Sequence, residues 1–144
     1  MKRVMPIALG AILTMPTLAL LPFTSQTSHL QPLTLHLDCP GGDCPLLRGT
    51  PQTAGMRSGF VRLKPGETVG WHTTDQNEES LVVLHGRGEA LVEGQPARPF
   101  TAPGLLYIPP LTRHNIANTG DVLLEYVYVV APVTGSQQGR PNKN

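Results

Sequence analysis

Short apolar runs separated by turn-forming residues recur along most of this chain, and no stretch after residue 30 keeps a helical period. Runs of this kind, bounded by Gly, Pro, Asn and Asp, are typical of β-strands. The turns, spaced roughly every ~8 to 12 residues, predict an all-β sandwich or barrel, and the pattern alone does not choose between them. The strands expected are 33–37, 56–63, 68–73, 80–85, 89–92, 97–101, 105–108, 114–117 and 122–130, with an irregular stretch at 46–55.

The N-terminus has the pattern of a targeting segment. Lys2 and Arg3 precede an uncharged, apolar run from Val4 to Phe23. A short basic start followed by such a run is typical of a secretory signal peptide. The run is also close to the ~20 residues that span a bilayer, although its three prolines disfavour a straight helix. We therefore expect residues 1–28 to be a signal peptide of an exported protein, periplasmic or secreted. An uncleaved N-terminal membrane anchor is the alternative.

The rest of the chain divides by composition. Residues 29–55 form an expected N-terminal extension with a cysteine loop, 56–132 a barrel, and 133–144 a disordered tail rich in Gly, Gln and Asn. Cys39 and Cys44 are separated by four residues, two of them Gly, which allows the chain to fold back. Outside the cytoplasm such a pair tends to be oxidised, so we expect a disulfide. The spacing is not that of redox or common zinc sites.

The charge of the chain argues against nucleic acid as a partner. The formal net charge is +1, and basic and aromatic residues do not interleave. Nucleic-acid-binding domains usually carry a basic stripe or patch. We therefore expect no nucleic-acid partner, and membrane contact only through an uncleaved N-terminus.

Three candidate metal ligands fall at the ends of expected strands, beside turns. They are His72, Glu79 and His114. Residues that flank a turn on one face of a hairpin lie close together, which can place His72 beside Glu79. His114 is distant in sequence, and only the fold can bring it to the other two.

The spacing around these residues resembles the two motifs of the cupin superfamily. In the first, Gly66 is followed after five residues by His72, and Glu79 after six residues by Gly86. The second motif is a Gly, a Pro-rich corner, a His and an Asn four residues later. Its residues here are Gly104, Pro109, His114 and Asn118.

The resemblance implies a double-stranded β-helix, or jelly-roll barrel, with His72, Glu79 and His114 as three of four metal ligands. The fourth cupin ligand is a second His two residues after the first, and this chain has Thr74 there. Two imidazoles and one carboxylate with open positions suit one divalent ion, Fe, Mn or Zn. The alternative is a barrel that has lost the metal.

Strand alternation predicts which residues near the candidate ligands point into the barrel. Thr74 is expected to line the pocket. Tyr126 and Tyr128 share one face of the last strand and line the pocket if that face is internal; otherwise they pack in the core or an interface. Glu79 rather than Glu78 is expected to point inward, and Trp71 and Arg113 are expected to point outward. We expect Tyr107 to pack in the core, Asn118 to form hydrogen bonds within its turn, and His85 to have a structural role.

These features support two functions. One is a metalloenzyme that acts on a small molecule, with dioxygenase, isomerase or decarboxylase chemistry as in families that the chain resembles. The other is a non-catalytic module that binds a sugar-like ligand without metal. The resemblance also implies a homodimer, for which the last strand is the candidate surface.

Overall fold

The computed structural model describes residues 30–40 and 42–133. The expected signal peptide or anchor at 1–28 lies outside the described residues, as does the expected tail beyond Val133. Within the described ranges no helix is long and apolar enough to cross a membrane.

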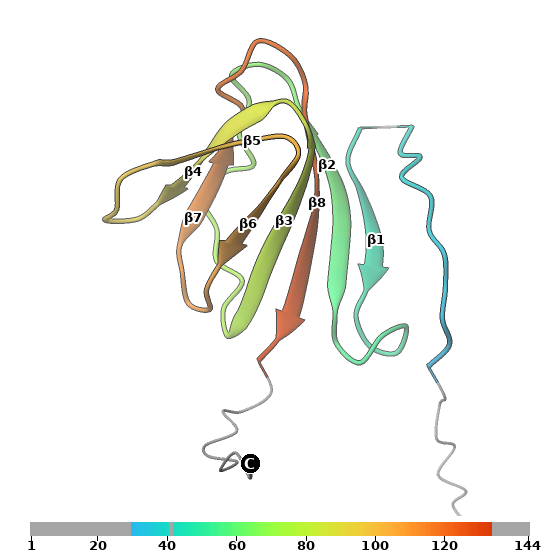
Figure 1. The fold of residues 1–144 in the computed structure, drawn as a ribbon. Coiled ribbons are helices and arrows are strands. Elements are labelled where there is room, and N and C mark those ends of the chain that lie inside the picture. Colours follow the sequence, from blue (N-terminus) through green and yellow to red (C-terminus); the bar gives the residue numbers. More distant parts are fainter. Residues whose placement is uncertain (1–29, 41, 134–144) are drawn as a thin grey trace, which may run out of the picture.

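Two antiparallel sheets make up the described part of the chain (Figure 1). The five-stranded sheet has the order β1-β2-β8-β3-β6, and the three-stranded sheet has the order β5-β4-β7. This all-strand architecture confirms the predicted β-barrel of the jelly-roll type. The strands are β1 (Cys44–Arg48), β2 (Arg57–Leu63), β3 (Asn77–His85), β4 (Arg87–Val92), β5 (Arg98–Thr101), β6 (Gly104–Ile108), β7 (His114–Ala117) and β8 (Leu124–Pro132).

Alternation along the strands builds the core between the sheets. On β3, Leu81 and Val83 are buried, whereas the intervening Val82 and Leu84 are exposed. The same alternation on the other strands gives one buried cluster, which contains Val61, Leu63, Leu81, Val83, Ala90, Ile108, Ile116, Leu124 and Tyr126.

The first strand lies later in the chain than the sequence predicted. Residues 33–37 pair with no strand, and β1 occupies Cys44–Arg48, inside a region expected to be partly irregular. β1 pairs with β2 through a short connection, from Arg48↔Arg57 to Cys44↔Phe60. Closing this local hairpin orders less chain than pairing the more distant 33–37 segment would, and it occupies the free edge of β2.

The strand predicted at 68–73 is also wrong as a continuous element. Only two isolated bridges form, Thr68↔Ala117 and His72↔His114. Gly70, between them, has a φ of +87°, which a β-ladder does not accommodate. In contrast, the predicted hairpin of β4 and β5 and the predicted strand at 114–117 are confirmed.

Tyr107 was expected in the core and is instead exposed. Its side chain is 54% accessible, and its hydroxyl donates to Glu78 Oε2 at 3.3 Å. Ile108 is buried, so strand alternation turns Tyr107 to the outer face.

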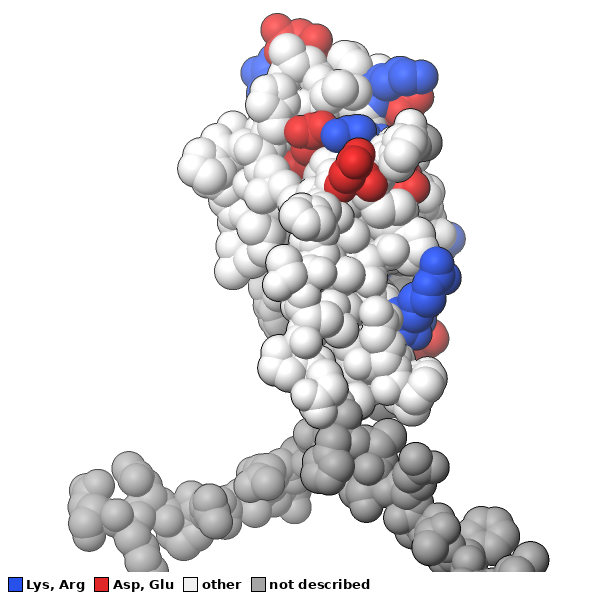
Figure 2. Space-filling model, turned by 90° about the vertical axis from the view of Figure 1, so that its right-hand side faces the viewer, with Lys and Arg blue, Asp and Glu red and all other residues white. Residues whose placement is uncertain are grey.

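The cysteine loop fastens the N-terminal extension beside β1. Cys39 and Cys44 form a disulfide with Cα atoms 5.7 Å apart, and Cys39 is buried. Along the extension, Leu30, Leu33, Leu35 and Leu37 are each 41–49% accessible. On the face that carries this segment, acidic and basic side chains gather mainly at one end (Figure 2).

Candidate metal centre

A cavity of about 360 Å³ opens on the inner face of the five-stranded sheet. Valine and isoleucine side chains supply part of its wall, together with charged and polar residues. Its lining residues are Arg57, Val61, Val69, His72, Thr73, Thr74, Asp75, Glu79, Ile116, Tyr126, Tyr128 and Val130.

His72 and His114 are brought together by the backbone. The N–H of each residue donates to the C=O of the other at 2.9 Å, as in a hydrogen-bonded antiparallel pair. Their rings lie 4.3 Å apart between centroids, tilted by 58°. His72 therefore joins the side of the barrel that carries β7, rather than forming a regular hairpin with β3.

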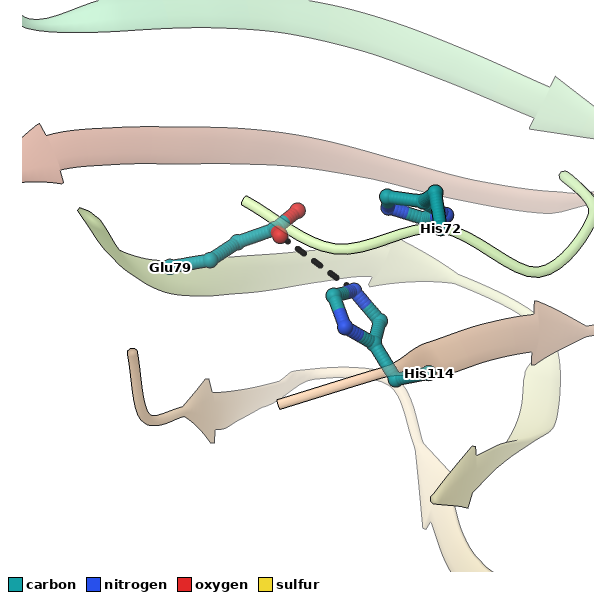
Figure 3. A group of neighbouring side chains, drawn as sticks. All are labelled: His72, Glu79 and His114. Carbon is teal, nitrogen blue, oxygen red and sulfur yellow. Dashed lines mark ion pairs between the residues drawn. The ribbon is translucent and has the colours of Figure 1, made fainter. Parts of the chain in front are cut away.

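Glu79 reaches the two imidazoles from the opposite sheet (Figure 3). It lies on β3 between Val130 of β8 and Ile108 of β6, and it is 5% accessible. Its Oε2 lies 3.3 Å from Nε2 of His114, which is fully buried. Glu78 faces outward, as predicted from the alternation.

Hydrogen bonds fix which nitrogen of each imidazole is available. Nδ1 of His72 lies 2.9 Å from the carbonyl oxygen of Gly70, and Nδ1 of His114 lies 2.9 Å from that of Thr112. A carbonyl oxygen only accepts hydrogen bonds, so both Nδ1 atoms carry the proton. In the neutral rings both Nε2 atoms are therefore unprotonated, which is the usual arrangement of metal-ligating histidines.

The buried polar atoms of this group fit a cation. Oε2 of Glu79 and Nε2 of His114 have no other hydrogen-bond partner among the described residues. If His114 is neutral, two lone-pair atoms face each other, and only a proton or a metal ion between them relieves the repulsion. The ligand atoms of His72, Glu79 and His114 all lie within 4.8 Å of one another. Ligands at ~2.0–2.2 Å from one ion are at most about 4.4 Å apart, so a small contraction suffices.

The same contacts set the proton affinity of His114. Burial lowers the pKa of its imidazole, and the Glu79 carboxylate and the Thr112 carbonyl raise it by hydrogen bonding and charge. The raising effects prevail, so the pKa of His114 lies above its usual value. A proton is thus the natural competitor of a metal ion at this position.

Comparison with known proteins assigns the family. The Cupin domain family matches residues 59–130, which is half of the chain. The chain belongs to the cupin domain family. This membership confirms the resemblance that the two sequence motifs indicated.

The cupin is similar to proteins of streptomycetes. It is 38% identical over 96 residues to "Protein SchB" of Streptomyces halstedii, covering 65% of this chain and 68% of that protein. It is 36% identical over 96 residues to "Polyketide synthase CurC" of Streptomyces cyaneus, covering 65% of this chain but only 61% of the relative. The crystal structure of a Cupin 2 conserved barrel domain protein from Salinispora arenicola has a TM-score of 0.55 and 26% identity, covering 73% and 89% of the two chains.

Thr74 lines the cavity, but its polar atoms form hydrogen bonds within its own turn. Its hydroxyl donates to the carbonyl of Asn77 at 3.1 Å, and its carbonyl accepts from the backbone N–H and the side-chain amide of Asn77. Thr74 therefore closes the loop before β3, and the group of described residues that could hold a metal ion contains His72, Glu79 and His114.

Tyr126 and Tyr128 both line the cavity. The face of β8 that carries them is therefore internal, which is one of the two alternatives that the sequence allowed. Burial, then the nearby charges of Glu79 and Asp43, raise the pKa of the Tyr126 phenol, which stays protonated at neutral pH. Tyr128 lies against Gly59: a Cβ at that glycine would be 2.5 to 2.7 Å from the ring and hydroxyl. Gly59 thus makes room for one wall of the cavity.

Trp71, Arg113 and His85 lie outside the cavity, as predicted. The guanidinium of Arg113 lies 5.5 Å from the centre of the Trp71 ring and also pairs with Glu93 at 3.2 Å. Nδ1 of His85 bonds the carbonyl of Leu123 at 2.9 Å. These contacts are structural, and none of the three residues joins the metal-ligand group.

Sequence reasoning missed the two other charged residues of the cavity, Arg57 and Asp75. Arg57 and Val61 are four residues apart on β2, so strand alternation places their side chains on the same face of the sheet. This alternation could have predicted that Arg57, like Val61, lines the cavity. Asp75 has a φ of +54° in the turn after Thr74, and no sequence signal predicts that its side chain reaches the cavity. Glu125 of β8 does not line the cavity and pairs with Arg62 at 2.7 Å.

Asn118 makes the turn contacts expected of it. Its amide nitrogen donates to the carbonyls of Leu63 and Val122, both at 2.8 Å, and its amide oxygen accepts from the N–H of Gly120 at 2.8 Å. It is 2% accessible, so these bonds are made in the interior. They tie the loop after β7 to the end of β2.

Proposed function

We propose that this cupin binds one divalent metal ion, Fe, Mn or Zn, through His72, Glu79 and His114 and acts on a small molecule in the adjoining cavity. One observation carries the proposal: both imidazoles bond a carbonyl through Nδ1, and one ligand atom each from His72, His114 and the buried Glu79 lie within 4.8 Å of one another. A structural histidine–glutamate pair needs one imidazole, whereas here a second ring is oriented in the same way.

The cavity residues suit the binding of an oxygenated organic compound. A divalent ion on this ligand set supplies Lewis-acid or, for iron and manganese, redox activation of bound oxygen atoms. The Tyr126 phenol, held protonated, is placed to donate a hydrogen bond inside the cavity. Two acids line the cavity, Glu79 and Asp75, and Glu79 is assigned to the ion. Dioxygenation, isomerisation and decarboxylation are the reaction types that we put forward.

The relatives support a small oxygenated substrate without identifying it. The name of CurC associates that protein with a polyketide synthase. Polyketides are oxygen-rich compounds, so this name agrees with the proposal of an oxygenated ligand; the chain covers 61% of CurC.

The proposal is tested by elemental analysis of purified protein, followed by chelation and titration with Fe(II), Mn(II) or Zn(II). We expect one ion per chain in the wild type and less than a tenth of that in His72→Ala and His114→Ala. His85→Ala is the matched control, since His85 also bonds a carbonyl through Nδ1 but joins no ligand group. A wild-type protein that is metal-free, binds none of the three ions and is equally stable with chelator would instead support the metal-free binding module.

We also propose that the chain is exported. The support is the basic start and apolar run of residues 1–28, together with the cysteine pair, which favours an oxidising compartment. Expression of the full chain in a bacterium, fractionation and mass spectrometry of the mature N-terminus test this. A homodimer remains a prediction for light scattering of the same preparation.

A further inference from the structure

Arg57 occupies a defined place relative to the proposed metal ligands. Arg57 pairs with Val130, and Val130 pairs with Glu79, so the three residues form one row across β2, β8 and β3. Adjacent strands are about 4.8 Å apart, which puts the Arg57 and Glu79 backbones roughly 10 Å from each other. All three side chains line the same cavity.

The guanidinium of Arg57 has no carboxylate partner among the described residues. The other arginine in its row, Arg48, lies directly opposite on β1 and is likewise without an ion pair there. By contrast, Arg62, Arg87 and Arg113 each pair with an acid. Charge-assisted hydrogen bonds to a guanidinium are strong, so an anion beside the unpaired Arg57 would be stabilising.

The charges of the cavity lining define how much negative charge a ligand should carry. Arg57 supplies one positive charge, and Asp75 and Glu79 supply one negative charge each. A bound divalent ion therefore leaves one positive charge in excess. Val130 lies between Arg57 and Glu79 in the row across β2, β8 and β3, and Val61, Val69 and Ile116 also line the cavity.

We infer that the ligand of this cavity is a small monoanion with an apolar or aromatic body, which gives an oxygen atom to the metal ion while Arg57 pairs with its negative charge at the mouth. The inference rests on the proposed function, because without the ion the lining carries an excess of negative charge. A cavity of about 360 Å³ is near the lower end of the ~300–1,000 Å³ of ligand sites, which favours one or two rings. Arg57 is then a specificity-determining residue.

The test uses zinc-loaded protein and isothermal titration calorimetry with two matched probes. Salicylate is a monoanion with adjacent oxygen atoms, and salicylamide has nearly the same shape without the carboxylate charge. We expect wild-type protein to bind salicylate at least about tenfold more tightly than salicylamide, as charge-assisted hydrogen bonds imply. Arg57→Gln should remove about tenfold or more of the salicylate affinity while leaving zinc content and salicylamide affinity unchanged.

Arg48→Gln is the matched control, because Arg48 is the partner of Arg57 on β1 and does not line the cavity. It should leave salicylate affinity within about twofold of wild type. Equal salicylate affinity in Arg57→Gln and wild type, equal affinity for the two probes, or no salicylate binding to zinc-loaded wild type would each overturn the inference. Failure of the proposed function is distinguishable, since it appears before any probe is added, as wild-type protein that retains no zinc.

Discussion

His72 and His114, 42 positions apart in sequence, are direct backbone partners, each donating its N–H to the carbonyl of the other at 2.9 Å. Their side chains leave this pair on the same side of the local ladder and meet Glu79 from the opposite sheet. The candidate centre therefore joins the two layers of the barrel, and its ligands are positioned by main-chain contacts.

The first prediction concerns Gly70, whose carbonyl accepts from Nδ1 of His72. A Cβ at this position meets no atom within 4 Å, so the strain of Gly70→Ala comes from its φ of +87°. We expect a loss of roughly 1–2 kcal/mol in unfolding free energy. Movement of the carbonyl should also weaken metal binding by about 10–100-fold. Both are measured by denaturant unfolding and metal titration.

Gly94→Ala is the control for Gly70→Ala. Gly94 lies in the β4–β5 turn with a φ of +72° and equally open surroundings. It should lose similar stability and keep its metal affinity. If both substitutions weaken metal binding equally, Gly70 has no particular role in orienting His72.

The second prediction separates the charge of Glu79 from its shape. In Glu79→Gln the amide can donate to the Nε2 lone pair of His114, so the metal-free protein should be as stable as wild type or more so. Metal affinity should fall by more than the ~10–100-fold that is typical when a residue that only hydrogen-bonds to a metal ligand is substituted. Thermal unfolding with and without Zn(II) should show the metal-induced rise in Tm only in the wild type.

Glu78→Gln, on the outward face of β3, is the matched control for Glu79→Gln and should keep the full metal-induced rise. A similar loss of that rise in both variants would indicate a general effect of acidic charge. A preserved rise in Glu79→Gln would remove Glu79 from the ligand set.

The third prediction is a pH dependence of the metal-free protein. The pKa of His114 in the folded state is raised above the unfolded value of 6.5. Its contribution to stability is therefore fully present below pH 6.5 and is lost as the pH rises through the folded pKa. Chelator-treated protein should show a falling Tm from about pH 6.5 upward.

Metal should reverse this trend, because zinc competes with the proton for Nε2 of His114 and gains affinity as the pH rises. In Glu79→Gln the carboxylate that raises the pKa is gone, so the decline in metal-free Tm should flatten. A decline that is unchanged in Glu79→Gln would assign the pH dependence to another group.

The fourth prediction concerns the wall that Tyr128 forms. Gly59→Ala places a Cβ 2.5 Å from Cε1 of Tyr128, so the ring must move. Overpacking of this kind typically destabilises by about 1–3 kcal/mol. The displaced ring should also lower the affinity for cavity ligands, measured by calorimetry. The double variant Gly59→Ala/Tyr128→Leu should recover stability, and no recovery would place the strain elsewhere.

The sequence predicted the barrel and the three candidate metal ligands. It did not predict which backbone contacts bring those ligands together. Spacing around His72 and Glu79 indicated the family, and alternation placed Glu79 inward and Trp71 outward. The expected hairpin between the flanks of the 75–77 turn does not explain the geometry, since His72 pairs with His114 instead. That pairing depends on Gly70 breaking the strand, a backbone conformation that the apolar pattern does not reveal.

Other features depended on choices that local pattern cannot make. Residues 33–37 alternate like a strand, yet the edge of β2 is taken by Cys44–Arg48, and competition for one edge is decided by the whole fold. Arg57 and Asp75 were missed because charged residues next to a strand end are usually solvent-facing. Their convergence on one cavity depends on the relative placement of β2 and the loop before β3.

In both histidines the ring is held by the carbonyl two positions earlier in its own segment, Gly70 for His72 and Thr112 for His114. The orientation of each imidazole is thus fixed by a hydrogen bond within a three-residue unit and does not require an ion. Exchange of one metal for another should then need little rearrangement of the imidazoles. If the proposed ion binds here, its identity would be decided by supply in the compartment of the protein and by the small molecules that complete the coordination sphere.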